Sequence, residues 1–358
     1  MKPISEVPST PLKFLSDDEQ GHLILEEGTV LETPINVSFR ILRKISSSPY
    51  SQIFEVCFEN NQEKHYAMKV SSATSIRQTD NEATILQDLN YQHGSQSSPY
   101  IPVFYSKFFL LGHIFIIEEL LSYNLIYVLR HHNYTGISLR LVQVVGKCVC
   151  EALAFMNQFF IIHGDIKPDN IVLKENSLDV KLIDYGSASI VGNFFNLYVQ
   201  TRYYRAPEVI LRVDLSSKSD VWSLGCTLLE TFFGLPIFPG KNEFHMLQLI
   251  TETLGEFPKT LLERSKIKDQ YYIDNHLKTN EQYEHDTGIK LPSFTPYFAF
   301  KTIPELVMNH KTPPALNETQ IQQREVFLDL IMNMLKIDPD QRYSIHDVQK
   351  HPFFNLDL

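Results

Sequence analysis

Acidic, basic and amide side chains stand close together near the middle of the chain. Residues 163–170 read His-Gly-Asp-Ile-Lys-Pro-Asp-Asn, and an Asp-Tyr-Gly sequence follows at 184–186. Asp165 can accept a proton from a hydroxyl group, and Lys167 can neutralise the charge of a moving group. Asn170 and Asp184 offer the hard oxygen ligands that Mg²⁺ prefers. Phosphoryl transfer needs an oriented hydroxyl and neutralised phosphate charge, so the spacing predicts a phosphoryl-transfer centre.

A second set of charged residues supports this hypothesis. Lys69, in Tyr-Ala-Met-Lys-Val, lies on an expected strand from which it can reach two phosphates, and Glu82 on the next helix can pair with it. Glu208, in Ala-Pro-Glu, can form an ion pair with Arg342, and Asp220 can anchor the backbone of the 163–170 loop. Taken singly, such residues are more often turn formers or solvent-facing charges. Their joint order and spacing carry the prediction.

The composition of the chain argues against several other classes of function. The chain has 358 residues and a net charge of −10, and no stretch is dense in Lys or Arg, so we expect no direct nucleic-acid binding and no membrane docking. The N-terminus lacks an apolar core of a signal peptide. Of the four cysteines, Cys148 and Cys150 have a spacing that fits neither a zinc knuckle nor a redox pair, which favours buried reduced thiols in an intracellular protein. We expect a monomer.

The order of apolar patterns predicts an α+β fold with two lobes. Residues 1–37 form an N-terminal extension with an expected hairpin at 21–33, residues 38–121 a small β-rich lobe with one helix, and residues 122–358 a larger, mostly helical lobe. A proline-containing stretch at 256–318 is predicted to be an irregular insert. A nucleotide would bind in the cleft between the lobes. The expected strands are 39–45, 53–58, 66–70, 103–109, 114–119, 171–173 and 180–183, and the expected helices are 81–89, 139–160, 219–233, 244–254, 321–335 and 344–350.

Over residues of about 38–353 the sequence resembles the eukaryotic protein kinases. The run Thr-Arg-Tyr-Tyr-Arg-Ala-Pro-Glu at 201–208 and the insert resemble the CMGC group, in particular its dual-specificity tyrosine-regulated branch. Within that branch the chain looks most like the pre-mRNA splicing kinases of the Prp-four type, on the runs at 163–170 (with a small residue at 164), 184–189, 238–247 and 266–272.

This resemblance implies phosphorylation of Ser and Thr hydroxyls with ATP and Mg²⁺. It makes Asp165 the catalytic base, with Lys167 and Asn170 as its helpers, and Asn170 and Asp184 the metal ligands. Thr201 would bridge Asp165 and Lys167.

For the nucleotide, the resemblance implies a Lys69–Glu82 ion pair, and adenine bound by the carbonyl of Glu119 and the N–H of Leu121. It assigns further nucleotide contacts to Ser46, Ser48, Ser51, Ile53, Ala67 and Leu173.

The activation segment carries its own predictions. Tyr198 falls where relatives autophosphorylate on tyrosine, although a packed loop aromatic is the alternative. A phosphorylated Tyr198 would pair with Arg202 or Arg205, and Arg205 would shape a pocket that favours proline after the phosphoacceptor.

The chain departs from the family pattern in three places. The phosphate loop, usually Gly-x-Gly-x-x-Gly, reads Ser-Ser-Ser-Pro-Tyr-Ser at 46–51, which predicts weaker ATP binding or slower turnover. Gly164 replaces the Arg that usually receives an activation-loop phosphate, which argues against that switch. Glu118 stands where relatives carry a bulky apolar gatekeeper, and a buried carboxylate is costly unless paired.

Three functions follow from these patterns. The leading hypothesis is an active Ser/Thr kinase that phosphorylates splicing factors in the nucleus. The second is a pseudokinase that serves as a binding module, favoured by the serine loop and Glu118. The third is a general regulatory kinase of the same branch in the cytoplasm.

Overall fold

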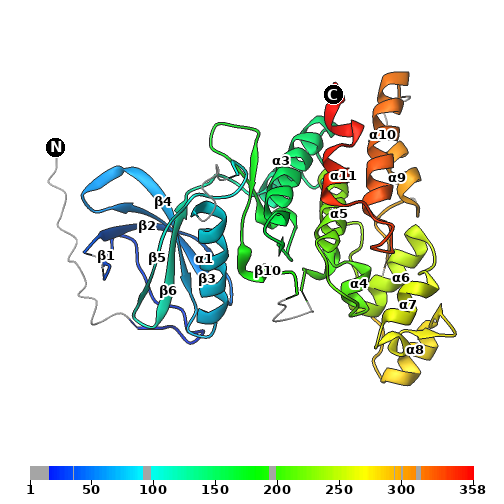
Figure 1. Cartoon of the computed structure of the whole chain (residues 1–358), viewed down its shortest axis with the longest axis horizontal. Coiled ribbons are helices and arrows are strands. Elements are labelled where there is room, and N and C mark those ends of the chain that lie inside the picture. The colour runs from blue at the N-terminus through cyan, green and yellow to red at the C-terminus, as the bar shows by residue number, and fades with distance from the viewer. Residues whose placement is uncertain are drawn as a thin grey trace. The chain divides into compact units, whose positions relative to one another are not determined.

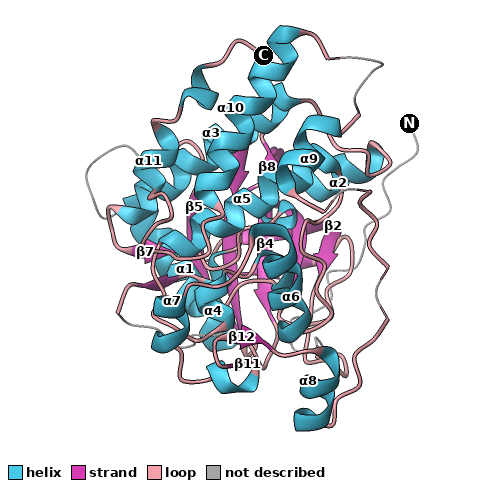
Figure 2. Cartoon of the chain, turned by 90° about the vertical axis from the view of Figure 1, so that its right-hand side faces the viewer, coloured by secondary structure: helices cyan, strands magenta, loops and turns pink. Residues whose placement is uncertain are grey.

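The computed structural model describes residues 16–34, 36–91, 98–192, 199–293, 295–299, 301–311 and 316–358. The chain divides into two compact units, Met1–Ser122 with Asp184–Gly186, and Tyr123–Ile183 with Ser187–Leu358. The predicted two-lobed α+β fold is confirmed, with strands dominating the first unit and helices the second (Figures 1 and 2). The inclusion of residues 184–186 in the first unit was not foreseen.

The first unit is built on one six-stranded antiparallel sheet with the order β1-β2-β3-β4-β6-β5. Helix α1 (Ile76–Tyr91) packs against β5 and β6 (Figure 1). The strands are β1 (Val30–Glu32), β2 (Ser38–Ser47), β3 (Ser51–Phe58), β4 (Asn61–Ser71), β5 (Phe104–Leu110) and β6 (His113–Glu119).

Strand β4 has apolar side chains on one face of the sheet and the charged side chain of Lys69 on the other. Successive side chains of a strand point to opposite faces. Tyr66, Met68 and Val70 therefore enter one buried apolar cluster, which they share with residues of β2, β3 and β6. Lys69 points to the other face, where it meets α1 through Glu82.

The N-terminal segment packs on this sheet, and its strand belongs to the sheet and not to a hairpin confined to residues 21–33. Strand β1 pairs with β2, and a single antiparallel bridge joins Asp17 to Leu23. Leu23 and Leu31 are 1% and 0% exposed in the apolar cluster. Covering a large apolar side chain contributes about 1.5–3 kcal/mol, so these two leucines help to hold the segment on the sheet.

The second unit is a helical assembly around the buried helix α5, whose neighbours include α3 and α10 (Figure 2). Its helices are α2 (Leu125–His131), α3 (Leu139–Asn157), α4 (Pro207–Ile210), α5 (Lys218–Phe233), α6 (Glu243–Leu254), α7 (Lys259–Arg264), α8 (Asn280–Thr287), α9 (Ile303–Asn309), α10 (Glu318–Met334) and α11 (Ile345–Gln349). Short antiparallel pairs are β7 (Ile161–Ile162) with β10 (Ser189–Ile190), β8 (Ile171–Leu173) with β9 (Val180–Leu182), and β11 (Tyr272–Ile273) with β12 (His276–Leu277). The 3-10 helices are η2 (Pro168–Asn170), η3 (Tyr185–Ser187, which begins in the first unit), η4 (Arg202–Tyr204), η5 (Lys268–Gln270) and η6 (Pro352–Asn355).

The stretch at 256–318 is more regular than the sequence predicted. It contains α7, α8, α9 and the β11–β12 hairpin. Prolines suggested an irregular loop, but capping boxes at Thr279 and Thr302 start two of these helices. Tyr283 of α8 also stacks on Phe244 of α6 with ring centroids 4.1 Å apart, which anchors the insert to the unit.

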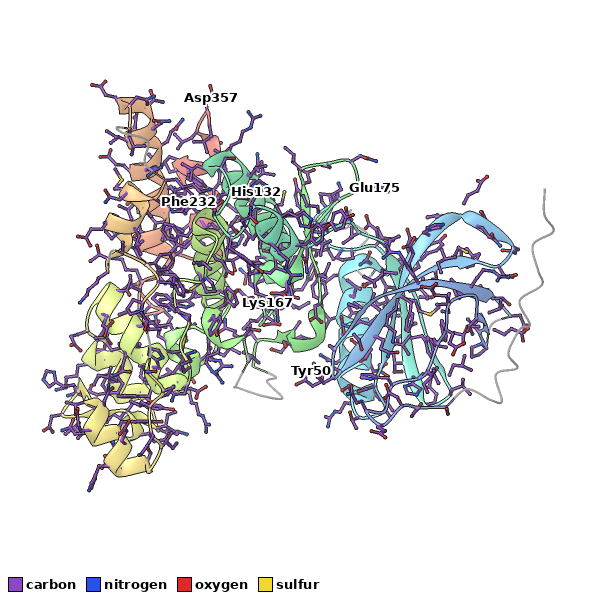
Figure 3. All side chains as sticks on the ribbon, turned by 180° about the vertical axis from the view of Figure 1, so that it is seen from behind. Tyr50, His132, Lys167, Glu175, Phe232 and Asp357 are labelled. Atoms are coloured by element: carbon purple, nitrogen blue, oxygen red, sulfur yellow. The ribbon has the colours of Figure 1, made fainter. Side chains whose placement is uncertain are left out.

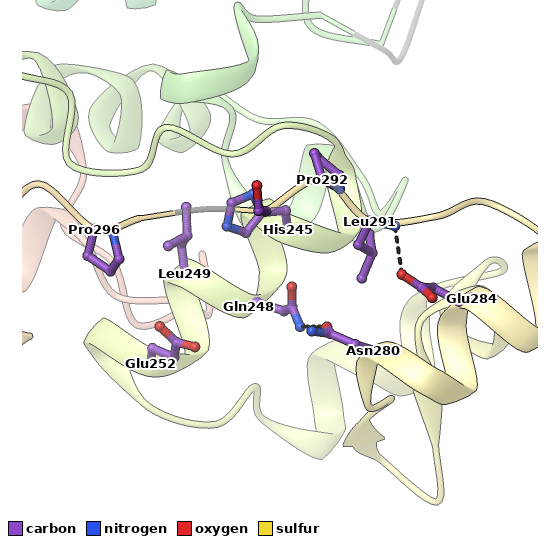
Figure 4. A pocket seen from close by; sticks show the side chains of 10 residues that line it. His245, Gln248, Leu249, Glu252, Asn280, Glu284, Leu291, Pro292 and Pro296 are labelled. Atoms are coloured by element: carbon purple, nitrogen blue, oxygen red, sulfur yellow. Dashed lines mark hydrogen bonds between the residues drawn. The ribbon is translucent and has the colours of Figure 1, made fainter.

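A hollow of about 370 Å³ lies where this insert meets α6, with Glu252 and Glu284 among its lining residues. Figure 4 shows Gln248 of α6 and Asn280 of α8 in its wall, joined by a hydrogen bond of 2.7 Å. The backbone N–H of Leu291 donates to Glu284 at 2.7 Å, which ties the chain after α8 back to that helix.

Among the described residues, no helix combines the length and the apolar character that a membrane span requires. Cys57, Cys148, Cys150 and Cys226 are buried free thiols. Burial raises the pKa of Cys148 to about 11, so this thiol stays protonated and unreactive at neutral pH.

Candidate functional site

In the first unit, Lys69 is held between two carboxylates. Its Nζ lies 2.7 Å from Oε1 of Glu82 on α1 and 3.0 Å from Oδ1 of Asp184. Burial by itself would lower the pKa of Lys69, but Asp184 and Glu82 outweigh it and raise that pKa above its usual value. Lys69 is therefore a fixed cation, as phosphate binding requires.

The phosphate loop forms its turn without glycine. The β2–β3 pairing continues to Ser47 opposite Gln52, and no residue from 46 to 51 has a positive φ. Ser48 Oγ accepts from the N–H of Tyr50 at 3.3 Å and of Ser51 at 3.2 Å, and donates to the Ser51 carbonyl at 3.2 Å. A serine side chain thus supplies the turn contacts, and Figure 3 shows the exposed Tyr50 at this turn.

The predicted nucleotide contacts are distributed over both units. Ala67 and Ile53 lie on β4 and β3, each directly opposite a residue of the neighbouring strand. Glu119 ends β6, where its N–H donates to Val103 at 2.9 Å, and Leu121 follows in the chain. Leu173 ends β8 and belongs to the second unit.

In the second unit, four hydrogen bonds hold the Asp165 carboxylate. Oδ1 accepts from the N–H and the hydroxyl of Thr201 at 3.0 and 2.7 Å. Oδ2 accepts from Lys167 at 2.6 Å and from Asn170 at 3.1 Å. Lys167 also donates to the Thr201 hydroxyl at 2.9 Å, so Thr201 bridges the acid and the cation (Figure 3 labels Lys167). The structure thus brings these four predicted residues together.

Asn170 and Asp184 suit a divalent cation by their chemistry. Nδ2 of Asn170 donates to the backbone carbonyl of Asp165 at 2.8 Å, which leaves Oδ1 as the metal-binding atom. Asp184 has a left-handed backbone with φ of 67°, which short acidic residues tolerate. Among the described residues no group of three His, Cys, Asp or Glu side chains could hold a metal, so a bound ion would need oxygens from a nucleotide as well.

The loop that carries Asp165 is fixed from α5. The buried Asp220 accepts from the N–H of His163 at 2.7 Å and of Gly164 at 2.9 Å. Gly164 has φ of +75°, and a Cβ there would lie 2.8 Å from the carbonyl oxygen of Ser187. Glycine is therefore a backbone requirement at this position, a reason that the sequence did not reveal.

Sequence reasoning missed two residues that organise the activation segment. Gln200 has a left-handed backbone with φ of 69°, and its side chain bonds Ser219, Ser223 and Ala206 at 2.9 Å each. Its position before Thr201 was the only signal available.

The second missed residue is Glu243 at the start of α6. Its Oε1 lies 3.0 Å from Arg205 and 3.8 Å from Arg202, so the two predicted activation arginines share one carboxylate. Tyr198, their predicted partner, lies outside the described residues.

The end of the activation segment is pinned by the ion pair expected from the sequence. Arg342 donates to both carboxylate oxygens of Glu208 at 2.6 and 2.9 Å, with both side chains fully buried. Breaking such a buried pair by removing one partner typically costs about 3–5 kcal/mol.

The fold and these two groups of residues are of the protein kinase type. A model of the protein kinase domain matches residues 39–354, and the chain belongs to this family. It is 30% identical to the probable serine/threonine-protein kinase yakA of Dictyostelium discoideum, over 97% of this chain but 26% of that protein. It is 31% identical to the serine/threonine-protein kinase ppk15 of Schizosaccharomyces pombe, over 97% and 69%.

A third relative is the homeodomain-interacting protein kinase 2 of Mus musculus, 29% identical over 95% of this chain and 29% of that protein. The chain thus spans only about a quarter of two of these relatives. Together they support the dual-specificity branch of the CMGC group. The closer resemblance to the Prp-four type stays a prediction.

We expect the S46G/S48G variant to bind ATP about three- to tenfold more tightly than the wild type. Removing the two side chains frees space for the phosphates near the loop backbone. Isothermal titration with ATP and Mg²⁺ measures the affinity, and S47G, between the two positions, is the matched control with no expected change. Equal affinities for S46G/S48G and wild type would show that the serine loop does not weaken binding.

We also expect the E118Q substitution to remove a pH dependence of stability. Burial raises the pKa of Glu118 to about 8, Glu82 adds to the rise, and Lys69 opposes it. The folded wild type keeps a proton that the unfolded chain releases above about pH 4.5, so its stability falls as pH rises towards 8. Urea unfolding of both proteins from pH 5 to 9 measures the free energy of unfolding. That of the wild type should fall relative to that of E118Q as the pH rises towards 8, and parallel curves of the two proteins against pH would contradict the assignment.

Proposed function

We propose that this chain is a protein kinase that uses ATP and Mg²⁺ to phosphorylate Ser and Thr hydroxyls of proteins. The observation that carries the proposal is the Asp165 carboxylate, held by four hydrogen bonds beside the Lys167 cation. Kinase domains use ATP with a divalent metal ion, and the family membership supports this chemistry.

In the proposed reaction, Asp165 accepts the proton of the substrate hydroxyl as its oxygen bonds to the γ-phosphorus. The bond from that phosphorus to the β–γ bridging oxygen breaks, and ADP leaves with the bonding electron pair. Lys167 offsets negative charge on the transferred group, and Lys69 holds the α- and β-phosphates. Mg²⁺, held by Asn170 and Asp184, would neutralise charge on the nucleotide phosphates.

A pseudokinase is the alternative that the serine loop favours. The loop completes its turn through Ser48, so the missing glycines leave the backbone path intact. Lys69 keeps both carboxylate partners, and Asp165 keeps its donors. These contacts favour the enzyme over the binding module.

We expect D165N to lose at least about a thousandfold in kcat while the affinity for ATP stays within about threefold, since the amide keeps the shape and loses the base. Transfer of labelled γ-phosphate to a protein substrate with Mg²⁺ measures kcat, and unchanged circular dichroism controls for folding. Equal labelling by wild type and D165N would remove the proposed activity.

A preference for proline after the phosphoacceptor is part of the proposal. Gln200 turns its carbonyl towards Arg205, whose Nη2 and Nε donate to it at 2.7 and 3.2 Å. Arg205 also binds the Val199 carbonyl at 3.1 Å and is fixed by Glu243. The Gln200 carbonyl already accepts two hydrogen bonds from Arg205, so it is a poor acceptor for a substrate N–H, and proline, which has no N–H, loses nothing there.

Peptides that differ only in Ser-Pro against Ser-Ala should therefore differ by about tenfold or more in kcat/KM, the scale of one unsatisfied polar group. The R205K variant, which cannot make the same forked contacts, should narrow the ratio and leave the affinity for ATP unchanged. A ratio near one for the wild type would contradict the preference.

The finer parts of the proposal concern the substrates, the regulation and the subcellular location of the enzyme. We propose splicing factors as substrates in the nucleus, on the resemblance to splicing kinases, with a monomeric enzyme. We propose autophosphorylation of Tyr198, supported by relatives named dual specificity kinases, YAK1 and CLK1. Phosphoproteomics after specific inhibition tests the substrates; no loss of splicing-factor sites would direct attention to a general regulatory kinase in the cytoplasm.

A further inference from the structure

One Ser-Pro step of this chain lies in the phosphate loop itself. It is Ser48–Pro49, and the proposed enzyme favours proline after the phosphoacceptor. The other positions with Ser or Thr before Pro are Thr10, Thr33, Ser98, Thr295 and Thr312. Thr33 and Ser98 are only 5% and 8% exposed, and Thr10 and Thr312 lie outside the described residues. Within the part of the chain that the structure describes, Ser48 and Thr295 are therefore the exposed candidates for such a phosphoacceptor.

Ser48 stands at the tip of the β2–β3 hairpin. Strand β2 ends at Ser47 and β3 begins at Ser51, so the turn between them consists of Ser48, Pro49 and Tyr50. All three turn residues are exposed, and Tyr50, labelled in Figure 3, is 59% exposed. A residue that precedes proline is restricted to extended backbone conformations, so Pro49 holds the backbone of Ser48 open at the tip. The Ser48 side chain is thus within reach of a second protein molecule.

Long hydrogen bonds hold the Ser48 hydroxyl in this turn. It donates to the carbonyl of Ser51 at 3.2 Å and accepts from the N–H groups of Tyr50 at 3.3 Å and of Ser51 at 3.2 Å. These distances lie at or beyond the upper end of the usual range for such bonds. Because the turn is also exposed to water, little free energy is needed to release the hydroxyl for a reaction.

We propose that Ser48 is a site of autophosphorylation, modified by a second copy of this chain, and that the phosphate weakens the binding of ATP. The inference rests on the proposed kinase function and on its preference for proline. In the reaction, the Ser48 oxygen bonds to the γ-phosphorus of ATP held by the other copy, and Asp165 of that copy accepts the hydroxyl proton. The bond from the γ-phosphorus to the β–γ bridging oxygen breaks, and ADP leaves with the bonding electron pair.

A phosphate on Ser48 changes both the turn and its charge. The esterified oxygen has no proton, so the bond to the Ser51 carbonyl is lost. The phosphate also adds a charge of about −1.5 to −2 at neutral pH. In protein kinases this loop covers the phosphates of the nucleotide, and like charges at that place repel each other. Phosphorylated Ser48 should therefore raise KM for ATP.

Phosphate transfer between two copies tests the site. We use D165N as the substrate, because it lacks the catalytic base, and add wild-type protein in small amounts with labelled ATP and Mg²⁺. Mass spectrometry of the peptides should find phosphate on Ser48 of D165N, at a rate proportional to the wild-type concentration, and none without wild type. The matched substrate D165N/P49A should be labelled at Ser48 about tenfold more slowly, the scale expected for Ser-Pro against Ser-Ala.

The two levels of the argument fail differently in this experiment. If the wild type phosphorylates a protein substrate but leaves Ser48 of D165N unmodified, the inference is wrong and the proposed function stands. Equal labelling of D165N and D165N/P49A would also contradict the inference, since proline would not select the site. A wild type that labels no protein at all would overturn the proposed function instead.

The effect on ATP binding needs a separate measurement. Wild type, S48A and T295A are incubated with ATP and Mg²⁺, and each is compared with its own sample before incubation. At ATP concentrations well below KM, the wild type and T295A should lose about tenfold in rate, while S48A should keep its starting rate. Saturating ATP should restore most of the lost rate, because the phosphate acts on KM and not on kcat. An unchanged rate of wild-type protein phosphorylated at Ser48, or an equal loss in S48A, would overturn the proposed effect.

Discussion

The second unit is organised around the fixed carboxylate of Asp165. It accepts four hydrogen bonds. Two come from Lys167 and Asn170 of the same loop, and two come from Thr201 in the activation segment. The Asp165 side chain is 13% exposed, and a partly buried acceptor with four donors is held in one orientation. Because Thr201 is one of the donors, the position of the activation segment at residue 201 also sets the orientation of the Asp165 carboxylate.

Helix α5 transmits this constraint to the rest of the unit. Asp220, near its N-terminus, accepts hydrogen bonds from the backbone N–H groups of His163 and Gly164. On the same helix, the carbonyl of Ser219 and the hydroxyl of Ser223 accept hydrogen bonds from the side-chain amide of Gln200. One buried helix thus fixes both the loop before Asp165 and the segment before Thr201. The burial of α5 from Ser219 to Phe233 is accordingly what the site requires, since a mobile helix would loosen the contacts at both segments at once.

The sequence predicted the parts of the site that depend on side-chain type and short spacing. Asp165, Lys167 and Asn170 are neighbours in the chain, and the alternation of β4 places Lys69 away from the apolar cluster. It could not predict features that depend on backbone torsion or on distant approach, such as the left-handed Gln200 or the contact that excludes a Cβ at Gly164. The helices of the insert were missed because prolines outweighed two capping boxes that only a few residues encode. The expected strands of the first unit appear with bounds shifted by a few residues, because their alternating apolar pattern is long and clear.

Gly164 and Glu243 together bear on how the arginines of the activation segment, Arg202 and Arg205, are held by a carboxylate of the protein itself. Position 164 has no side chain that could receive a phosphate, and its backbone geometry admits none. The positive charge of Arg202 and Arg205 is met instead by Glu243, a carboxylate built into the start of α6. Arg205 in turn holds the carbonyls of residues 199 and 200, next to Thr201. A phosphate that approached Arg202 or Arg205 would have to compete with Glu243 for arginines that are already engaged, and residues 199–208 have their contacts in the structure without it.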